Sequence, residues 1–109
     1  MPQFILLLRD AGPLPEDMSP AEIQSIIESY RGWMEKMNGT GHKLRDGEGR
    51  VVSGNDGAMS VTDGPYAEAK EILGGFMIVE ADDYDAAVAL CQDSPHLGSG
   101  TIEIRQIER

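Results

Sequence analysis

The sequence predicts an α+β fold, in which a ferredoxin-like antiparallel sheet carries two helices on one face. The expected elements run in the order strand, helix, hairpin, strand, helix, strand. The two most apolar segments are short, as strands buried on both faces are. With 109 residues, the chain is expected to form one domain over residues 1–109.

The first half begins with a continuous apolar run at residues 4–8, which predicts a buried strand. Ser19, Pro20 and Glu22 then form a helix start: Ser19 caps, Pro20 fits the first helical position and Glu22 completes a capping box. Apolar residues recur at helical spacing up to Met37, and Asn38-Gly39 ends the pattern. We therefore expect a helix over residues 19–37 with one apolar face.

The middle of the chain is rich in turns. Asp46-Gly47 predicts a hairpin between short strands near 42–45 and 50–53. A second turn at residues 54–57 leads to a short strand near 58–62. Residues 67–71 are expected to form a single helical turn.

The last third predicts a strand, a helix and a strand. Residues 75–81 predict the second buried strand, and residues 101–105 alternate as a half-buried strand does. Asp82 or Asp83 caps the helix between them, whose inward residues are expected to be Tyr84, Ala87, Val88 and Cys91.

Two helices can cover only one face of this sheet, yet the strands at 4–8 and 76–79 are apolar on both faces. A second copy of the chain is the simplest cover for the bare face. We therefore expect a homodimer that closes as an α+β barrel. The space between its two sheets would be a natural pocket for a small molecule.

Composition excludes several classes of function. A net charge of −10 argues against direct nucleic-acid binding, and no apolar run is long enough to span a membrane. The single cysteine, Cys91, cannot form an intrachain disulfide, and no signal peptide precedes the first strand, so a cytoplasmic protein is expected. Two distant histidines and lone Gly-x-Gly pieces indicate no metal site and no nucleotide cofactor.

Residues 61–71, Val-Thr-Asp-Gly-Pro-Tyr-Ala-Glu-Ala-Lys-Glu, resemble the signature of the YCII-related family, in the branch marked by a DGPF-type motif. The similarity continues at residues 74–76, 94–97 and 102–105. The resemblance implies a ferredoxin-like fold that dimerises as a barrel. Some enzymes of this family, linked to dehalogenation of aromatic ring products, use a His–Asp pair with the histidine near the start of the first helix. Residues 19–37 contain no histidine, so that pair is not carried over.

His96 and Asp63 are the candidate catalytic residues. An imidazole near neutral pH can act as a general acid or base. Asp63 begins the signature loop, where its carboxylate either fixes the turn or orients a histidine. The expected sheet order brings His96 and the signature loop toward the same edge, which is a reason to pair them.

The candidate ligand-binding residues are Tyr66, Glu68, Lys70 and Arg105. Tyr66 stands where the motif has Phe, and Glu68 and Lys70 share one face if the segment is extended. Arg105 either clamps a carboxylate or pairs with an acid across the dimer.

Two functions remain open from the sequence. One is a small-molecule-binding protein or small enzyme with a pocket in the dimer barrel. The alternative is a non-catalytic accessory protein of sigma-factor-type transcription regulation, because other DGPF proteins occur beside extracytoplasmic-function sigma factors.

Overall fold

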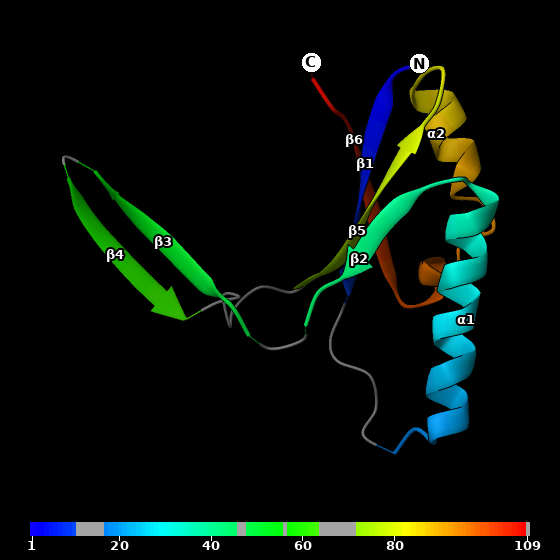
Figure 1. The fold of residues 1–109 in the computed structure, drawn as a ribbon, viewed down its shortest axis with the longest axis horizontal. Helices are drawn as coiled ribbons and strands as arrows, with labels where there is room; N and C mark the ends of the chain where they lie inside the picture. The colour runs from blue at the N-terminus through cyan, green and yellow to red at the C-terminus, as the bar shows by residue number, and fades with distance from the viewer. Residues whose placement is uncertain (11–16, 46–47, 56, 64–71, 109) are drawn as a thin grey trace.

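The computed structural model describes residues 1–10, 17–45, 48–55, 57–63 and 72–108. Figure 1 shows a sheet with the helices on one side and a hairpin that projects away from it. In chain order the elements are β1 (Gln3–Asp10), α1 (Pro20–Lys36), β2 (Thr40–Lys43), β3 (Arg50–Asn55), β4 (Ala58–Asp63), β5 (Ile72–Glu80), α2 (Tyr84–Leu90), the 3₁₀ helix η1 (Pro95–Gly98) and β6 (Gly100–Gln106).

The main sheet has four strands in the order β2-β5-β1-β6, and every neighbouring pair is antiparallel. The two apolar strands, β1 and β5, take the central positions, and the more polar β2 and β6 form the edges. Both α-helices lie on the same side of this sheet (Figure 1). The predicted ferredoxin-like α+β fold is confirmed.

The core lies between the helices and one face of the sheet. Side chains alternate along β1, so that Phe4, Leu6 and Leu8 are buried against the helices, while Ile5 and Leu7 are half-buried on the other face. The buried apolar cluster comprises Phe4, Leu6, Leu8, Trp33, Met37, Met77, Val79, Ala81, Ala87 and Cys91.

Helix α1 starts as predicted. The Ser19 hydroxyl accepts a hydrogen bond from the Glu22 amide at 3.1 Å, and the Glu22 carboxylate accepts one from the Ser19 amide at 3.3 Å. The expected apolar face is buried only in its second half, where Trp33 and Met37 join the core. The first half extends past the end of the sheet (Figure 1), and Ile23 and Ile27 remain 37% and 44% exposed.

Helix α2 starts after one of the two caps predicted for it and ends before Cys91. The Asp83 carboxylate caps it by accepting a hydrogen bond from the Ala86 amide at 2.8 Å, and Ala87 and Cys91 face inward as expected. Tyr84 also turns toward the sheet, where its ring packs edge-on against Phe4 with centroids 4.9 Å apart, although 47% of it stays exposed. The inward placement of Val88 was wrong, since it is 53% exposed. A helix of seven residues contacts the sheet along a narrow stripe, and Val88 lies about 100° round the helix from Ala87.

The predicted hairpin is formed by different strands. Strand β3 pairs with β4 through a turn that includes Gly57, whose φ of 83° favours glycine, and β2 instead pairs with the edge of β5. The expected pairing of 42–45 with 50–53 was therefore wrong, and Asp46-Gly47 lies outside the described residues. The free edge of β5 offers backbone hydrogen-bond partners to β2, whose own side chains stay exposed or half-buried.

Among the described residues, no helix combines the length and the apolar character that crossing a lipid bilayer requires.

Candidate functional site

His96 is the most buried polar residue near the end of the sheet, with 2% of its surface exposed. It lies in η1, where the Ser94 hydroxyl accepts a hydrogen bond from its amide. Its Nε2 atom lies 2.8 Å from the carbonyl oxygen of Arg9, and its Nδ1 atom lies 2.8 Å from the Tyr30 hydroxyl. A carbonyl oxygen can only accept, so Nε2 carries a hydrogen. In the neutral ring, Nδ1 is therefore the acceptor and the Tyr30 hydroxyl is the donor.

Tyr30 brings this hydroxyl from the middle of α1. Burial raises the pKa of the Tyr30 phenol above its ordinary value; a hydrogen bond with Ser99 opposes the shift, and the negative charge of Asp10 adds to it. The phenol therefore stays protonated at neutral pH and serves as a hydrogen-bond donor rather than as a base. Its ring meets the imidazole edge-on, with centroids 6.0 Å apart.

Asp10, the last residue of β1, completes the group. Its Oδ1 atom lies 3.6 Å from His96 Nδ1, and its side chain is 29% exposed, whereas the imidazole is almost fully enclosed. A proton placed on Nδ1 would face this carboxylate directly. We refer to Asp10, Tyr30 and His96 as the acid–base cluster.

The acid–base cluster occupies space that is open only because Gly74 and Gly100 carry no side chain. A Cβ atom on Gly74 would lie 2.0 Å from the Asp10 carboxylate, and one on Gly100 would lie 2.6 Å from His96 Nε2 and 1.9 Å from the Arg9 carbonyl oxygen. Real Cβ atoms essentially never come closer than 3.0 Å to such neighbours. The positions of Asp10 and His96 therefore depend on glycine in β5 and in β6.

The acid–base cluster lies at the polar end of a cleft of about 860 Å³. Its walls are the exposed apolar half of α1, the adjoining ends of β1, β2 and β5, and η1. Apolar side chains form most of its lining, which suits the body of a small organic molecule. The lining residues are Leu8, Asp10, Ile23, Ile26, Ile27, Ser29, Tyr30, Arg31, Met34, Gly41, His42, Lys43, Gly74, Gly75, Phe76, Met77, Pro95, His96, Gly98 and Ser99.

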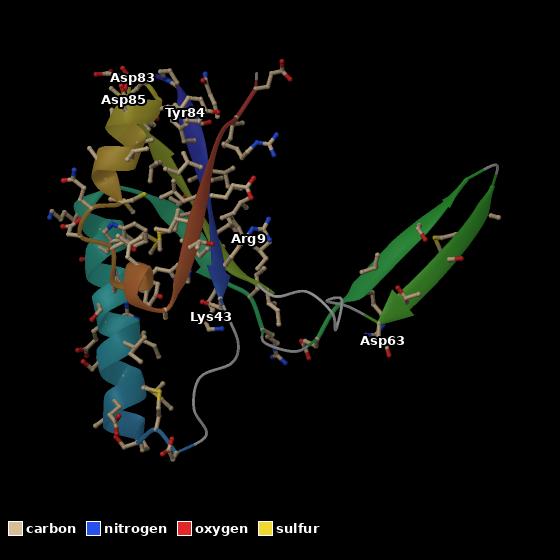
Figure 2. All side chains as sticks on the ribbon, turned by 180° about the vertical axis from the view of Figure 1, so that it is seen from behind. Arg9, Lys43, Asp63, Asp83, Tyr84 and Asp85 are labelled. Carbon is tan, nitrogen blue, oxygen red and sulfur yellow. The ribbon has the colours of Figure 1, made fainter. Side chains whose placement is uncertain are left out.

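The two candidate catalytic residues are not together within one chain. Asp63 is at the end of β4, on the hairpin that lies apart from the main sheet (Figure 2), and its carboxylate pairs with Arg50 at 3.4 Å. Register places these two residues opposite each other in the hairpin, which explains the ion pair. The carboxylate beside His96 is that of Asp10.

The remaining candidates divide into two groups. Tyr66, Glu68 and Lys70 lie outside the described residues. Arg105 is exposed on β6, where its guanidinium lies 3.7 Å from the Glu103 carboxylate, and it does not line the cleft. Arg105 and Glu103 lie opposite Ile5 and Leu7 of β1, so both are on the helix-free face of the sheet.

Asp10 and Tyr30 were missed as site residues in the sequence. Asp10 lies two residues after the first apolar run, at the end of β1, and Tyr30 places a hydroxyl on the apolar face of α1. A polar group that ends a buried strand or interrupts an apolar stripe is the signal that could have found them.

Cys91 lies in the core, away from the residues that line the cleft. Burial raises the pKa of the Cys91 thiol, and its Sγ atom lies 3.6 Å from the Ala87 carbonyl oxygen inside the core. Over the described ranges, no group of three or more His, Cys, Asp or Glu side chains is placed to hold a metal ion.

Comparison with known protein families identifies a match to this chain. No curated protein matches the chain. The family model of the YCII-related domain matches residues 4–109. This range includes all the helices and strands described above, apart from the first residue of β1. The chain belongs to the YCII-related family.

Proposed function

We propose that the protein binds a small, largely apolar molecule in the cleft and transfers a proton to or from it through the acid–base cluster. One observation carries this proposal: a buried, fully hydrogen-bonded imidazole and a half-buried phenol stand beside a carboxylate at the polar end of an apolar cleft. Such convergence of a few polar groups on an apolar cavity is typical of small-molecule sites.

The chemistry follows from what each group can do. The Asp10 carboxylate is partly exposed, so it can reach a ligand proton and act as the base. The Tyr30 phenol keeps its proton. When the hydroxyl turns this hydrogen from His96 Nδ1 to the ligand, it can donate a hydrogen bond to a ligand oxygen on which negative charge develops. His96 is enclosed: before the ligand binds, its Nδ1 accepts the Tyr30 hydrogen and holds the hydroxyl at the cleft, while its Nε2 donates to the Arg9 carbonyl. The ligand's proton goes to Asp10, and the resulting negative charge rests on the ligand oxygen next to Tyr30.

Binding is tested by blocking the cleft. Ile27→Asp places a charge in the apolar wall, and Val88→Asp, on an exposed apolar position of α2 outside the cleft, is the matched control. A fragment screen by ligand-observed NMR should give hits that bind the wild type and the control but not Ile27→Asp. Equal binding to all three proteins would refute a site in the cleft. That result would leave the accessory role in transcription regulation as the better hypothesis.

Proton transfer is tested with 2-tetralone, an apolar ketone whose α-hydrogens exchange with solvent. In D₂O at neutral pH, the wild type should accelerate deuterium uptake, as followed by ¹H NMR. Asp10→Asn should abolish the acceleration, since no base remains, and Tyr30→Phe should reduce it by about 10²-fold because the oxygen loses its donor. Val88→Asp should behave as wild type. Exchange at the uncatalysed rate, with 2-tetralone bound in the cleft, would restrict the function to binding.

We also propose that the helix-free face of the sheet joins two copies of the chain. Ile5 and Leu7 on β1 share this face with Phe76 and Ile78 on β5, and all four are half-buried in the single chain. Charged residues of β1 and β6 border them, including Arg9, whose guanidinium lies 3.3 Å from Glu103. An apolar centre with a polar rim is the usual composition of such an interface.

The interface is tested by light scattering at micromolar concentration. The wild type should have the mass of a dimer, and Leu7→Glu should have that of a monomer, because two introduced carboxylates would face each other near the centre. Val88→Glu, on the helix side, should remain dimeric. A monomeric wild type would refute the interface.

Two finer assignments rest on the sequence. The motif at residues 61–71 supports the DGPF-type branch of the family. A single buried thiol, Cys91, fits a reducing compartment such as the cytoplasm.

A further inference from the structure

One face of the β3–β4 hairpin is apolar and exposed. Register sets Val52 opposite Val61 and Gly54 opposite Met59, so the side chains of Val52, Met59 and Val61 lie on the same face of the hairpin. Each of these three side chains is more than half exposed. The other face carries Val51, Ser53, Ala58, Ser60 and Thr62. We refer to Val52, Met59 and Val61 as the hairpin face.

The hairpin stands apart from the packed part of the chain. Strands β3 and β4 pair with each other and form a sheet of their own. The radius of gyration is 16.0 Å, against about 13 Å for a compact domain of this length. A single two-stranded hairpin is at best marginally stable in water, and its exposed ion pair between Arg50 and Asp63 adds little. We therefore expect the hairpin to gain its stability by packing the hairpin face on another surface.

The direction of the hairpin indicates which surface this is. It projects on the side of the sheet opposite the helices (Figure 1). The half-buried Ile5, Leu7, Phe76 and Ile78 lie on the same side, where a second copy of the chain is proposed to dock. Packed sheets lie about 10 Å apart, and strands of six residues are about 20 Å long. The hairpin is therefore long enough to extend past the sheet of that copy.

The area of the helix-free face also favours this placement. The four strands of the main sheet present a face of about 450 Å², given about 4.8 Å between strands and about 3.3 Å per residue. A stable interface usually covers about 800 Å² of each partner. By the same measure, one face of the hairpin covers about 200 Å². If each copy contributes its hairpin and receives that of the other, the added area of about 400 Å² brings the interface to the usual size.

We propose that the hairpin is an arm that packs the hairpin face on a second copy of the chain, and that each copy receives the arm of the other. The inference rests on the pairing of helix-free faces proposed above, because that pairing places the second copy beside the hairpin. Figure 2 shows Asp63 at the end of the hairpin nearest the main sheet. The exposed Arg50–Asp63 pair therefore lies at the base of the arm, and the apolar side chains toward its tip contact the second copy.

Sedimentation velocity over a dilution series measures the dissociation constant of the dimer. Val61→Lys places a charge in the hairpin face, and Thr62→Lys, on the other face of the same strand, is the matched control. Val61→Lys should raise the dissociation constant at least about 100-fold, because each dimer loses two valine contacts worth about tenfold each. Thr62→Lys should change it less than about fivefold. Equal effects of the two variants would overturn the arm.

A second measurement uses the wild type and so does not depend on the folding of a variant. Chains that carry ¹³C-methyl methionine are mixed with unlabelled chains until the subunits have exchanged, and Met59→Leu identifies the Met59 signal. Isotope-filtered NMR should show nuclear Overhauser effects from the Met59 methyl group to protons of the unlabelled copy. Effects within one chain only, or none, would show that the arm does not pack on a second copy.

Leu7→Glu separates failure of the arm from failure of the sheet interface. A dimer that Leu7→Glu abolishes and Val61→Lys leaves intact retains the sheet interface and overturns the arm. A dimer that withstands Leu7→Glu but not Val61→Lys supports the arm and refutes the sheet interface. A monomeric wild type overturns both. Ligand binding in the cleft is decided separately by Ile27→Asp.

Discussion

Replacing Gly100 by alanine should displace the His96 imidazole and so disrupt the acid–base cluster. The new Cβ atom would lie 1.9 Å from the Arg9 carbonyl oxygen and 2.6 Å from His96 Nε2, against an ordinary contact of 3.4–4 Å. Strands β1 and β6 would have to separate locally by about 1.5 Å at the Asp10–Gly100 pair, and the hydrogen bond from Nε2 to Arg9 would break.

The cost can be worked from these contacts. Leaving the enclosed Nε2–H group without an acceptor costs about 1–3 kcal/mol, and forcing an extra methyl group into packed backbone costs about the same again. The expected loss of unfolding free energy is therefore about 2–6 kcal/mol, a large part of the total for a domain of this size. The midpoint of urea unfolding should fall by at least about 1 M.

Gly98→Ala is the matched control. No atom lies within 4 Å of a Cβ at this position, which ends η1 two residues before Gly100. Its stability should equal that of the wild type or exceed it by about 0.4–1 kcal/mol, since alanine restricts the unfolded chain. Urea titrations followed by Trp33 fluorescence give both values, and long-range ¹H–¹⁵N spectra report which imidazole nitrogen carries hydrogen. Equal stability of the two variants, with an unchanged His96 tautomer, would refute the described packing around His96.

Three further results are expected. Tyr30→Phe should remove a tyrosine transition that lies above the ordinary pKa of about 10 in a phenolate titration at 295 nm. Since the folded state holds this proton more tightly, Tyr30 contributes stability that is complete below about pH 10 and is lost at higher pH, and the variant should lose less stability there. Asp63→Ala should change the unfolding free energy by less than about 1 kcal/mol, because its ion pair with Arg50 is exposed, and a larger loss in urea titrations would indicate another partner. Ser19→Ala should cost about 1 kcal/mol through loss of the capping box, and a melting temperature equal to that of wild type would contradict this role.

Local signals in the sequence were sufficient for the fold. The capping box at Ser19 and the apolar runs of β1 and β5 depend on neighbours within a few residues, and each was found where expected. The partner of β2 was not local, since its choice between β3 and β5 depends on which edge the folded sheet leaves free.

The site was less accessible to sequence reasoning. His96 was identified by its chemistry, but its partners come from the end of β1 and the middle of α1, more than 60 residues away. Asp63 was favoured because it begins a conspicuous motif. Asp10 has no motif around it, and only the antiparallel pairing of β1 with β6, which sets Asp10 opposite Gly100, places it near the imidazole.

The apolar stripe of α1 shows why a core and a ligand wall are indistinguishable in a sequence. Ile23, Ile27, Met34 and Met37 follow one helical period, yet only the last of these is buried in the core. The helical spacing of the apolar residues identifies the apolar face of α1, but the length of the sheet determines how much of that face is covered. Leaving Ile23 and Ile27 in water gives up stabilisation that a longer sheet would have supplied. A ligand that covers Ile23 and Ile27 stabilises the folded state by mass action, by about 2.7 kcal/mol when its concentration is a hundred times its Kd. The half of α1 that contributes least to folding is therefore the half through which ligand binding would stabilise the protein.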